Sequence, residues 1–296
     1  MFGPNISRKL DVQVPYHHRS EEFVTIHGDL VALFRDKFAI PKNYEILFYT
    51  GSGTLCIESF ISHFDGALSI RSDDLTKDKF AQRWVNIARH YGKLDETSPH
   101  ELVVHYETSH SKVNDIRNAT FVDAVSSFPY FETPTSPAWA TVSSKILGSV
   151  PVLGIMVIDR DFLENNMTKE SPSYMNPRSH RTYQSEGQTP FTPALPLFAD
   201  LYEQLRSFDV HAMRDTIRTN HALIRDALGE ENLINSDLSP VITVKSGVIP
   251  DELARKWKLY GYLSKDVPQK LQIFLYAEEP ELYEQLATDL AREKNA

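Results

Sequence analysis

Short apolar runs alternate with longer stretches of helical periodicity through most of the chain, and this alternation limits the fold more than any other feature of the sequence. The runs are rich in Val, Ile, Leu and aromatic residues and are bounded by polar residues, Gly or Pro, which is typical of buried parallel strands joined by helices. The predicted strands are 45–49, 67–70, 102–105, 120–123, 139–142 and 152–158, and the predicted helices between them include 55–64 and 77–91. The pattern therefore predicts an α/β fold.

The pattern changes after residue 193. Two long helices are followed by strand, helix, strand and helix, which predicts a smaller α+β unit. Its predicted elements are helices 193–208, 210–228, 250–260 and 280–293 and strands 240–245 and 270–277. Segments 132–138 and 171–193 are rich in Pro, Ser and Thr and are predicted loops. We expect a large α/β domain over residues 17–195 and a small α+β domain that comprises residues 196–296 together with the N-terminal segment 1–16.

The composition excludes several classes of protein. The chain has 296 residues, a net charge of −9 and one cysteine, Cys56. One cysteine makes neither an intramolecular disulfide framework nor a cysteine-based zinc site, which favours a reducing compartment. No apolar run approaches the roughly 20 residues that span a bilayer, so we expect a cytoplasmic protein with no membrane partner. The acidity weighs against a large nucleic-acid footprint.

Three polar signals each follow a predicted strand. Gly51-Ser52-Gly53-Thr54 opens a predicted helix, where free N–H groups and two hydroxyls suit a single phosphate group. Asp123 ends an apolar strand, where open α/β sheets bind ligands. Lys145 follows another strand end, and a partly buried lysine there is suited to Schiff-base chemistry. Taken singly, these signals also fit an ordinary turn, a helix cap and a surface lysine.

Together the three signals match the needs of pyridoxal phosphate. A helix N-terminus holds its phosphate, a carboxylate keeps its ring nitrogen protonated, and a lysine condenses with its aldehyde. A metal site is a weaker interpretation of the sequence. His105, Glu107 and His110 lie close together, but His110 falls beyond the predicted strand and no further ligand is near in sequence. We therefore predict no metal.

The three signals belong to a longer series of motifs. In chain order these are Gly3-Pro4, His17-His18-Arg19-Ser20 with Glu22-Phe23, Gly51-Ser52-Gly53-Thr54 with Glu58, Phe80-Ala81-Gln82-Arg83, His105-Tyr106-Glu107-Thr108-Ser109, the residues from Asp123 to Ser127, Ser143-Ser144-Lys145 and Pro190-Phe191-Thr192-Pro193. With these motifs in this order, the chain resembles the class V aminotransferases of the fold-type I pyridoxal-phosphate enzymes, in particular the 2-aminoethylphosphonate and alanine/serine–glyoxylate branches. The resemblance implies a mostly parallel sheet flanked by helices in a large domain, with a small α+β C-terminal domain.

The resemblance also implies a role for each matching residue. Lys145 resembles the Schiff-base lysine that also moves the proton, and Asp123 resembles the partner of the pyridine nitrogen. Thr192 matches a threonine that reaches the phosphate of the neighbouring subunit, which implies a homodimer with shared active sites. The remaining cofactor contacts implied by position are the phosphate turn Ser52, Gly53 and Thr54, the additional donor Ser144, the stacking ring of Phe80 and the hydroxyl of Thr108.

Two departures from the family leave the substrate open. The stretch 92–102 is too short for the strand and helix that the family usually has there, so the chain reads as a compact member. The family's C-terminal domain normally supplies an arginine that binds the substrate carboxylate, but the corresponding stretch 270–277 has none. The candidate substrate-binding side chains are therefore His18, Arg19, Arg178 and Arg181.

Three functions remain after these observations. The first is amino transfer from a small-molecule amine or amino acid through Lys145. The second is decarboxylation or another lyase reaction on an amino acid attached to a hypermodified thymine in phage DNA. This reaction resembles the chemistry of compact phage relatives. It would make modified DNA a partner and would place the protein in the host cytoplasm. The third is a non-catalytic binding protein with the same fold.

Overall fold

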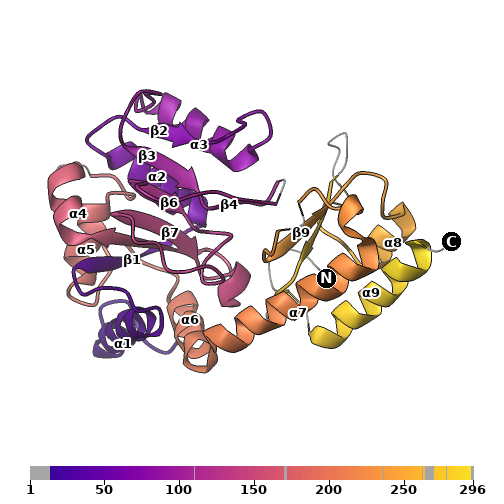
Figure 1. Ribbon diagram of the computed structural model, residues 1–296. Helices are drawn as coiled ribbons and strands as arrows, with labels where there is room; N and C mark the ends of the chain where they lie inside the picture. The colour runs from indigo at the N-terminus through magenta and orange to yellow at the C-terminus, as the bar shows by residue number, and fades with distance from the viewer. Residues whose placement is uncertain are drawn as a thin grey trace.

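The computed structural model describes residues 14–109, 111–169, 172–235, 237–261, 263, 270–277 and 279–294. These residues form two lobes that lie side by side (Figure 1). Gly3-Pro4 and His110, which belong to the sequence motifs above, lie outside the described residues.

A six-stranded sheet forms the centre of the larger lobe, in the order β1-β8-β7-β6-β3-β2. Its strands are β1 (Tyr44–Thr50), β2 (Ser69–Arg71), β3 (Glu101–Val104), β6 (Phe121–Asp123), β7 (Ala138–Val142) and β8 (Leu153–Asp159). The predicted strands all form, with shifted ends. Strand β8 is antiparallel to both neighbours, so the parallel prediction is wrong for 152–158. The connection from β7 to β8 is about ten residues long, shorter than a parallel crossover requires.

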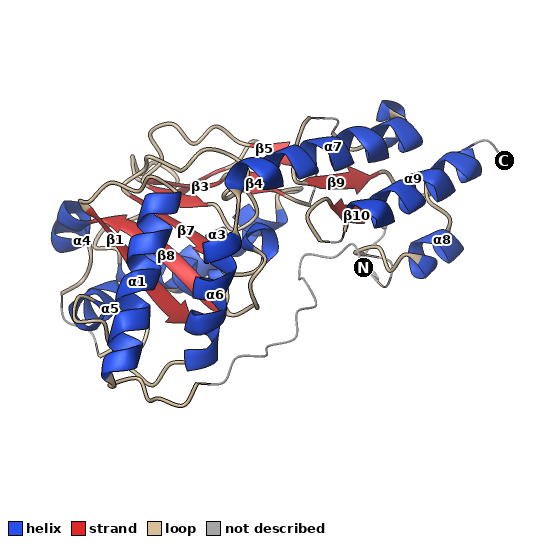
Figure 2. Ribbon diagram, turned by 90° about the horizontal axis from the view of Figure 1, so that it is seen from below, coloured by secondary structure: helices blue, strands red, loops and turns tan. Residues whose placement is uncertain are grey.

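Helices cover both faces of this sheet. On one face α1 (Glu21–Lys37) and α6 (Leu195–Ser207) lie side by side (Figure 2). Their apolar stripes share a buried cluster with the strands, to which α1 contributes Phe23, Leu30 and Phe34. The second cluster of the lobe contains residues of α2 (Gly53–His63), α3 (Lys79–His90) and α4 (Arg160–Asn166). The sheet is therefore buried between two helical layers, and its strand ends form the rims of the lobe.

Three helices, α1, α4 and α5 (Pro177–Gln184), arise where none was predicted. Helix α1 begins after Ser20, whose hydroxyl accepts the N–H of Phe23 at 3.3 Å. Helix α5 lies inside the segment 171–193, so the loop predicted there is wrong over these residues. The Asn176 side chain accepts the N–H of Arg178 at 2.9 Å, and Pro177 suits the first helical turn. Because α5 is almost entirely polar, it has no apolar period to detect.

The smaller lobe is a two-stranded sheet covered by helices. Its elements are α7 (Val210–Leu228), β9 (Val241–Val244), α8 (Asp251–Lys256), β10 (Leu271–Phe274) and α9 (Pro280–Lys294). Helix α7 extends from the larger lobe into the smaller one, where it packs on α9 (Figure 1). Helix α6 packs on the larger lobe, and the domain division after residue 195 stays a prediction. No described helix combines the length and the apolar character needed to cross a membrane.

A short hairpin connects the two lobes. It consists of β4 (Tyr106–Glu107) and β5 (Lys112–Val113) and follows β3 of the large sheet. The Tyr106 hydroxyl donates to the carbonyl of Val241 at 2.6 Å, and Tyr106 packs with Val241 and Phe274 of the small sheet. The hairpin therefore links the edge of the large sheet to β9 and β10.

Candidate active site

Three strands bring the sequence signals to one edge of the large sheet. Thr50 at the end of β1 pairs with Leu153, and Val142 at the end of β7 pairs with Gly154. Asp123 at the end of β6 pairs with Ala140 of β7. The chain therefore leaves β1, β6 and β7 at the same edge, where the Gly51–Thr54 turn, Asp123 and Lys145 follow. Ligands of open α/β sheets bind at such an edge.

Asp123 is buried and both of its carboxylate oxygens accept a hydrogen bond. Oδ2 accepts from the indole Nε1 of Trp84 at 3.0 Å, and Oδ1 accepts from the backbone N–H of Val125 at 3.1 Å. Burial raises the pKa of Asp123, while the Val125 N–H and the nearby Lys145 act in the opposite direction. The carboxylate is thus fixed in orientation, in surroundings where a cationic partner stabilises it.

Lys145 is half-buried at the start of a short 3-10 turn, Lys145–Leu147. Its backbone has φ of 56°, which is unusual for a residue with a side chain. Its Nζ donates to the Ser126 hydroxyl at 2.6 Å. The pKa of Lys145 is lowered to about 8, mainly by burial and also by Arg83, whereas Asp123 and Glu107 act in the opposite direction. About a tenth of this amine is therefore neutral, and so nucleophilic, at about pH 7.

Phe80 and Glu107 line the approach to Lys145. The Lys145 Nζ lies 5.9 Å from the centroid of the Phe80 ring. The backbone N–H of Phe80 donates to the Glu107 carboxylate at 3.1 Å, so the β4–β5 hairpin holds the start of α3. Glu107 is fully buried, and burial raises its pKa, although its hydrogen bonds with Ser109 lower it.

The phosphate turn predicted at residues 51–54 leads from β1 into α2. Ser52 is the exposed N-cap residue of α2, and its side chain makes no capping bond. Gly53 is buried, and a Cβ built on it would lie 2.6 Å from a methyl carbon of Val125. A glycine is therefore required for α2 to approach the segment that follows Asp123. The Thr54 hydroxyl lies 3.5 Å from Nη1 of Arg83.

Thr108 and Ser144 also lie near this edge. The Thr108 carbonyl accepts hydrogen bonds from the Thr243 hydroxyl at 3.1 Å and from the Gln272 side-chain amide. Its backbone is therefore fastened to the small lobe, and the contact of its hydroxyl with a cofactor stays a prediction. Ser144 is buried immediately before Lys145.

The other predicted side chains lie apart from Lys145. Arg178 donates to the backbone carbonyls of Leu163, Glu164 and Met167 and pairs with the Glu164 carboxylate, so it anchors the end of α4. Arg181 lies 3.7 Å from the carboxylate of Glu45, near the start of β1 and hence at the opposite edge of the sheet.

Arg19 is exposed, and its Nε donates to the ring of His18 at 3.4 Å. Thr192 is also exposed, beside Phe191, whose ring stacks on Tyr174 at 4.5 Å. Two residues later, the N–H of Ala194 donates to the Thr50 hydroxyl at 3.3 Å, which places this segment near the phosphate turn. The substrate contacts predicted for His18, Arg19, Arg178 and Arg181, and the phosphate contact predicted for Thr192, stay predictions.

Sequence reasoning assigned no role to three residues that the structure brings into the site: Arg83, Trp84 and Glu107. Phe80, Arg83 and Trp84 are spaced so that one helix presents them within one turn. This spacing indicates that Arg83 and Trp84 lie on the same side of the helix as Phe80. Glu107 gave no local signal, because its contacts with α3 depend on the packing of the hairpin.

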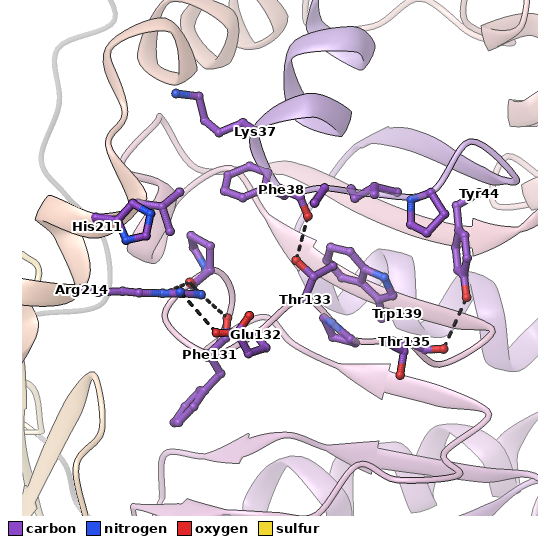
Figure 3. A pocket seen from close by; sticks show the side chains of 16 residues that line it. Lys37, Phe38, Tyr44, Phe131, Glu132, Thr133, Thr135, Trp139, His211 and Arg214 are labelled. Carbon is purple, nitrogen blue, oxygen red and sulfur yellow. Dashed lines mark hydrogen bonds and ion pairs between the residues drawn. The ribbon is translucent and has the colours of Figure 1, made fainter.

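Besides a pocket of about 500 Å³ between α1, the start of β1 and α5, whose lining includes Arg181, two further pockets of the described residues lie on this lobe. The first lies between the start of α2, the start of α3 and the end of β6, and its lining includes Thr54, Phe80, Trp84, Asp123, Val125 and Ser126. The second, of about 390 Å³, lies between the end of α1, the loop after Pro129 and the start of α7 (Figure 3). It contains none of the predicted site residues, and its Arg214 side chain is engaged with the Pro129 and Phe131 carbonyls.

Comparisons with known proteins identify the fold. No known protein-family profile matches the chain. The chain is 23% identical over 212 residues to a phosphoserine aminotransferase of Azobacteroides pseudotrichonymphae. That match covers 62% of the chain but only 56% of the relative, so it spans little more than half of that protein's length.

Solved structures match more completely. An aspartate aminotransferase of subgroup IV from Thermus thermophilus has a TM-score of 0.81 at 20% identity, covering 99% of this chain and 98% of that one. A phosphoserine aminotransferase from Trichomonas vaginalis with bound pyridoxal phosphate has a TM-score of 0.72 at 12% identity, covering 95% and 90%. The chain has the fold of these aminotransferases, which confirms the predicted fold-type I architecture.

Proposed function

We propose that the chain is a pyridoxal-phosphate-dependent aminotransferase that acts through Lys145 on a small-molecule amine or amino acid. The observation that carries the proposal is the meeting of Lys145, Asp123 and the N-terminus of α2 at one sheet edge, beside the ring of Phe80. Similarity to aminotransferases in sequence and in fold supports the same function.

The residues present fit the cofactor. The pocket between α2, α3 and β6 has Thr54 of the predicted phosphate turn in its lining, and Gly53, at the start of α2, could carry no side chain because of Val125. Asp123 at its base is the one carboxylate in the pocket lining and is suited to the ring nitrogen. Phe80 offers a flat apolar face, and Lys145 lies within reach of that face.

When bound, pyridoxal phosphate supplies an aldehyde and an electron-withdrawing ring. This chain supplies the rest. Ser126 orients the Lys145 Nζ, burial keeps part of that amine neutral, and the freed Nζ is placed to take and return the proton that moves during amino transfer. Asp123, held by Trp84 and Val125, would present its carboxylate to the ring nitrogen.

We also propose a homodimer in which Thr192 of one copy reaches the cofactor phosphate of the other. The exposure of Thr192 and of the neighbouring Phe191 and Tyr174 rings supports an interface on this surface. The cytoplasmic location stays a prediction. Neither the lyase reaction on modified DNA nor a non-catalytic role is favoured by a specific observation in the described residues.

The test is an amino-transfer assay with purified protein, pyridoxal phosphate, a panel of amino acids and a 2-oxo acid acceptor, followed by mass spectrometry. We expect a new amino acid to form from the acceptor, and Lys145→Ala to lower its rate at least about a hundredfold. Lys42→Ala, which removes an exposed lysine at the opposite edge of the sheet, is the control and should retain the rate. Release of carbon dioxide without amino transfer would replace this proposal by the lyase alternative.

A further inference from the structure

Arg83 is an exposed arginine of α3 that points back toward the site rather than along the surface. Its Cζ lies 5.2 Å from the centroid of the Phe80 ring, and its Nη1 lies 3.5 Å from the Thr54 hydroxyl. A guanidinium over an aromatic face is favourably placed by the ring quadrupole. These two contacts fix the side chain at the rim of the pocket.

No carboxylate of the described residues lies within ion-pair distance of Arg83. Glu58, one turn after Thr54 in α2, instead accepts the hydroxyl of Tyr91 at 2.9 Å. Glu107 is buried and engaged with the N–H groups of Phe80 and Ser109. Arginines on the rest of the surface commonly pair with acids, as Arg117 does with Asp115 at 2.6 Å. The Arg83 guanidinium, which contacts the Phe80 ring and the Thr54 hydroxyl, therefore keeps donors that no carboxylate of the described residues engages.

Arg83 and the start of α2 both bring positive charge to this rim. Arg83 acts electrostatically on both Lys145 and Asp123, lowering the pKa of each. It also lies beside the N-terminal end of α2, where the helix dipole is positive. Asp123 is the only acid of the pocket lining and lies at its base, away from solvent. An anion at the rim would be stabilised by this positive charge.

We propose that Arg83 binds an anionic group, a carboxylate or a phosphate, at the mouth of this pocket. The proposal rests on the proposed function and names the charge of the group that the site recognises. Two sources share this chemistry: the acidic group of the amino donor, and the phosphate of the cofactor. A planar guanidinium suits either, because it presents paired donors to two oxygens. Arg83 would then supply the cation that β10 lacks.

The test compares Arg83→Gln and Arg83→Lys with Arg89→Gln. Arg89 lies near the other end of the same helix and donates to Asn86, so its variant makes the same change of charge away from the pocket. Inorganic phosphate is first titrated into cofactor-free protein by calorimetry. We expect Arg83→Gln to weaken phosphate binding about tenfold, Arg83→Lys to weaken it less, and Arg89→Gln to leave it unchanged.

Two further arms separate the sources. If the anion is the cofactor phosphate, Arg83→Gln raises the Kd of pyridoxal phosphate but not that of pyridoxal, which has no phosphate. If the anion belongs to the substrate, the variant raises KM for an acidic donor by a larger factor than it lowers kcat, and the ratio of the Kd values of pyridoxal phosphate and pyridoxal stays that of the parent protein. Equal values for Arg83→Gln and the parent protein in all three measurements would overturn the proposal. Failure of the proposed function gives a different result. The parent protein would then show no absorbance of a lysine-linked cofactor, whether or not Arg83 binds phosphate.

Discussion

The indole Nε1 of Trp84 donates a hydrogen bond of 3.0 Å to Oδ2 of Asp123, and this bond ties helix α3 to the end of strand β6. Both residues are almost completely buried. The bond therefore orients the carboxylate where water does not compete for the hydrogen bond. It also stabilises the negative charge of Asp123 in low-dielectric surroundings. It also connects Asp123 to the helix that carries Phe80 and Arg83.

Trp84→Phe keeps an aromatic ring and removes this donor. We expect the pKa of Asp123 to rise, because the Trp84 hydrogen bond lowers it, and we expect the free energy of unfolding to fall by about 1–3 kcal/mol. Affinity for pyridoxal phosphate should fall as well, because Asp123 loses its fixed orientation. Denaturant unfolding and a fluorescence titration with the cofactor measure these two effects.

Trp257→Phe is the matched control for that variant. Trp257 also donates its indole N–H to a carboxylate, Asp289 at 2.9 Å, but in the small lobe. We expect it to leave cofactor affinity unchanged. Equal losses of affinity in both variants would show that the Trp84 bond acts through overall stability and not through Asp123.

The contact between Gly53 and Val125 gives a second prediction. Gly53→Ala places a methyl group 2.6 Å from a Val125 methyl carbon, so α2 must move away from the segment after Asp123. We expect a loss of about 1–3 kcal/mol in stability, together with weaker cofactor binding. Val125→Ala added to Gly53→Ala should restore most of both. A double variant as impaired as the single one would mean that Gly53 is needed for a reason other than this contact.

The pH dependence of cofactor attachment tests the environment of Lys145. Its pKa of about 8 lies below the ordinary value of 10.5, so the neutral amine becomes abundant at lower pH than for a surface lysine. We expect the rate of attachment to rise about tenfold per pH unit below about pH 7 and to level off above about pH 9. Stopped-flow absorbance over that range measures it, and a rate still rising at about pH 10 would contradict the depressed pKa.

Two variants should shift that profile in opposite directions. Arg83 lowers the pKa of Lys145, so Arg83→Gln should move the midpoint to higher pH. Asp123 raises the pKa of Lys145, so Asp123→Asn should move the midpoint to lower pH. Arg89→Gln should leave the midpoint in place, because Arg89 lies near the other end of α3.

The hydrogen bond from Gln272 to the Thr108 carbonyl predicts that the two lobes depend on each other. Gln272 is a buried residue of β10, and Gln272→Met keeps its length while removing the donor. We expect the free energy of unfolding to fall by about 1–3 kcal/mol, since the Thr108 carbonyl keeps only the Thr243 hydroxyl. Cofactor affinity should also fall, because the hairpin that holds Phe80 through Glu107 loosens. Gln285→Met, exposed on α9, is the control and should change neither quantity.

Local patterns in the sequence were sufficient to predict much of this site. Apolar strands with polar ends located the ends of β1, β6 and β7, and parallel strands bring their carboxyl ends to one edge. The meeting of Asp123 and Lys145 followed from that rule. The antiparallel direction of β8 was missed, because a buried strand has the same apolar run in either direction.

The long-range contacts that hold the site residues in position could not be predicted from local sequence patterns. Trp84 and Asp123 are 39 residues apart, and Gln272 and Thr108 are 164 residues apart, so each pair depends on how helices and lobes pack. Arg178 and Arg181 looked equally available in the sequence, but their partners lie on α4 and β1. A cation that pairs within the fold and one that faces a pocket have the same local sequence signal.

The most direct measurement of the central claim is to locate the cofactor on the chain. The protein is incubated with pyridoxal phosphate, reduced with borohydride to make the link permanent, digested, and mapped by mass spectrometry. We expect one stoichiometric label, on Lys145, and its disappearance in Lys145→Arg. A label distributed over surface lysines, or the same label intensity in Lys145→Arg, would contradict it.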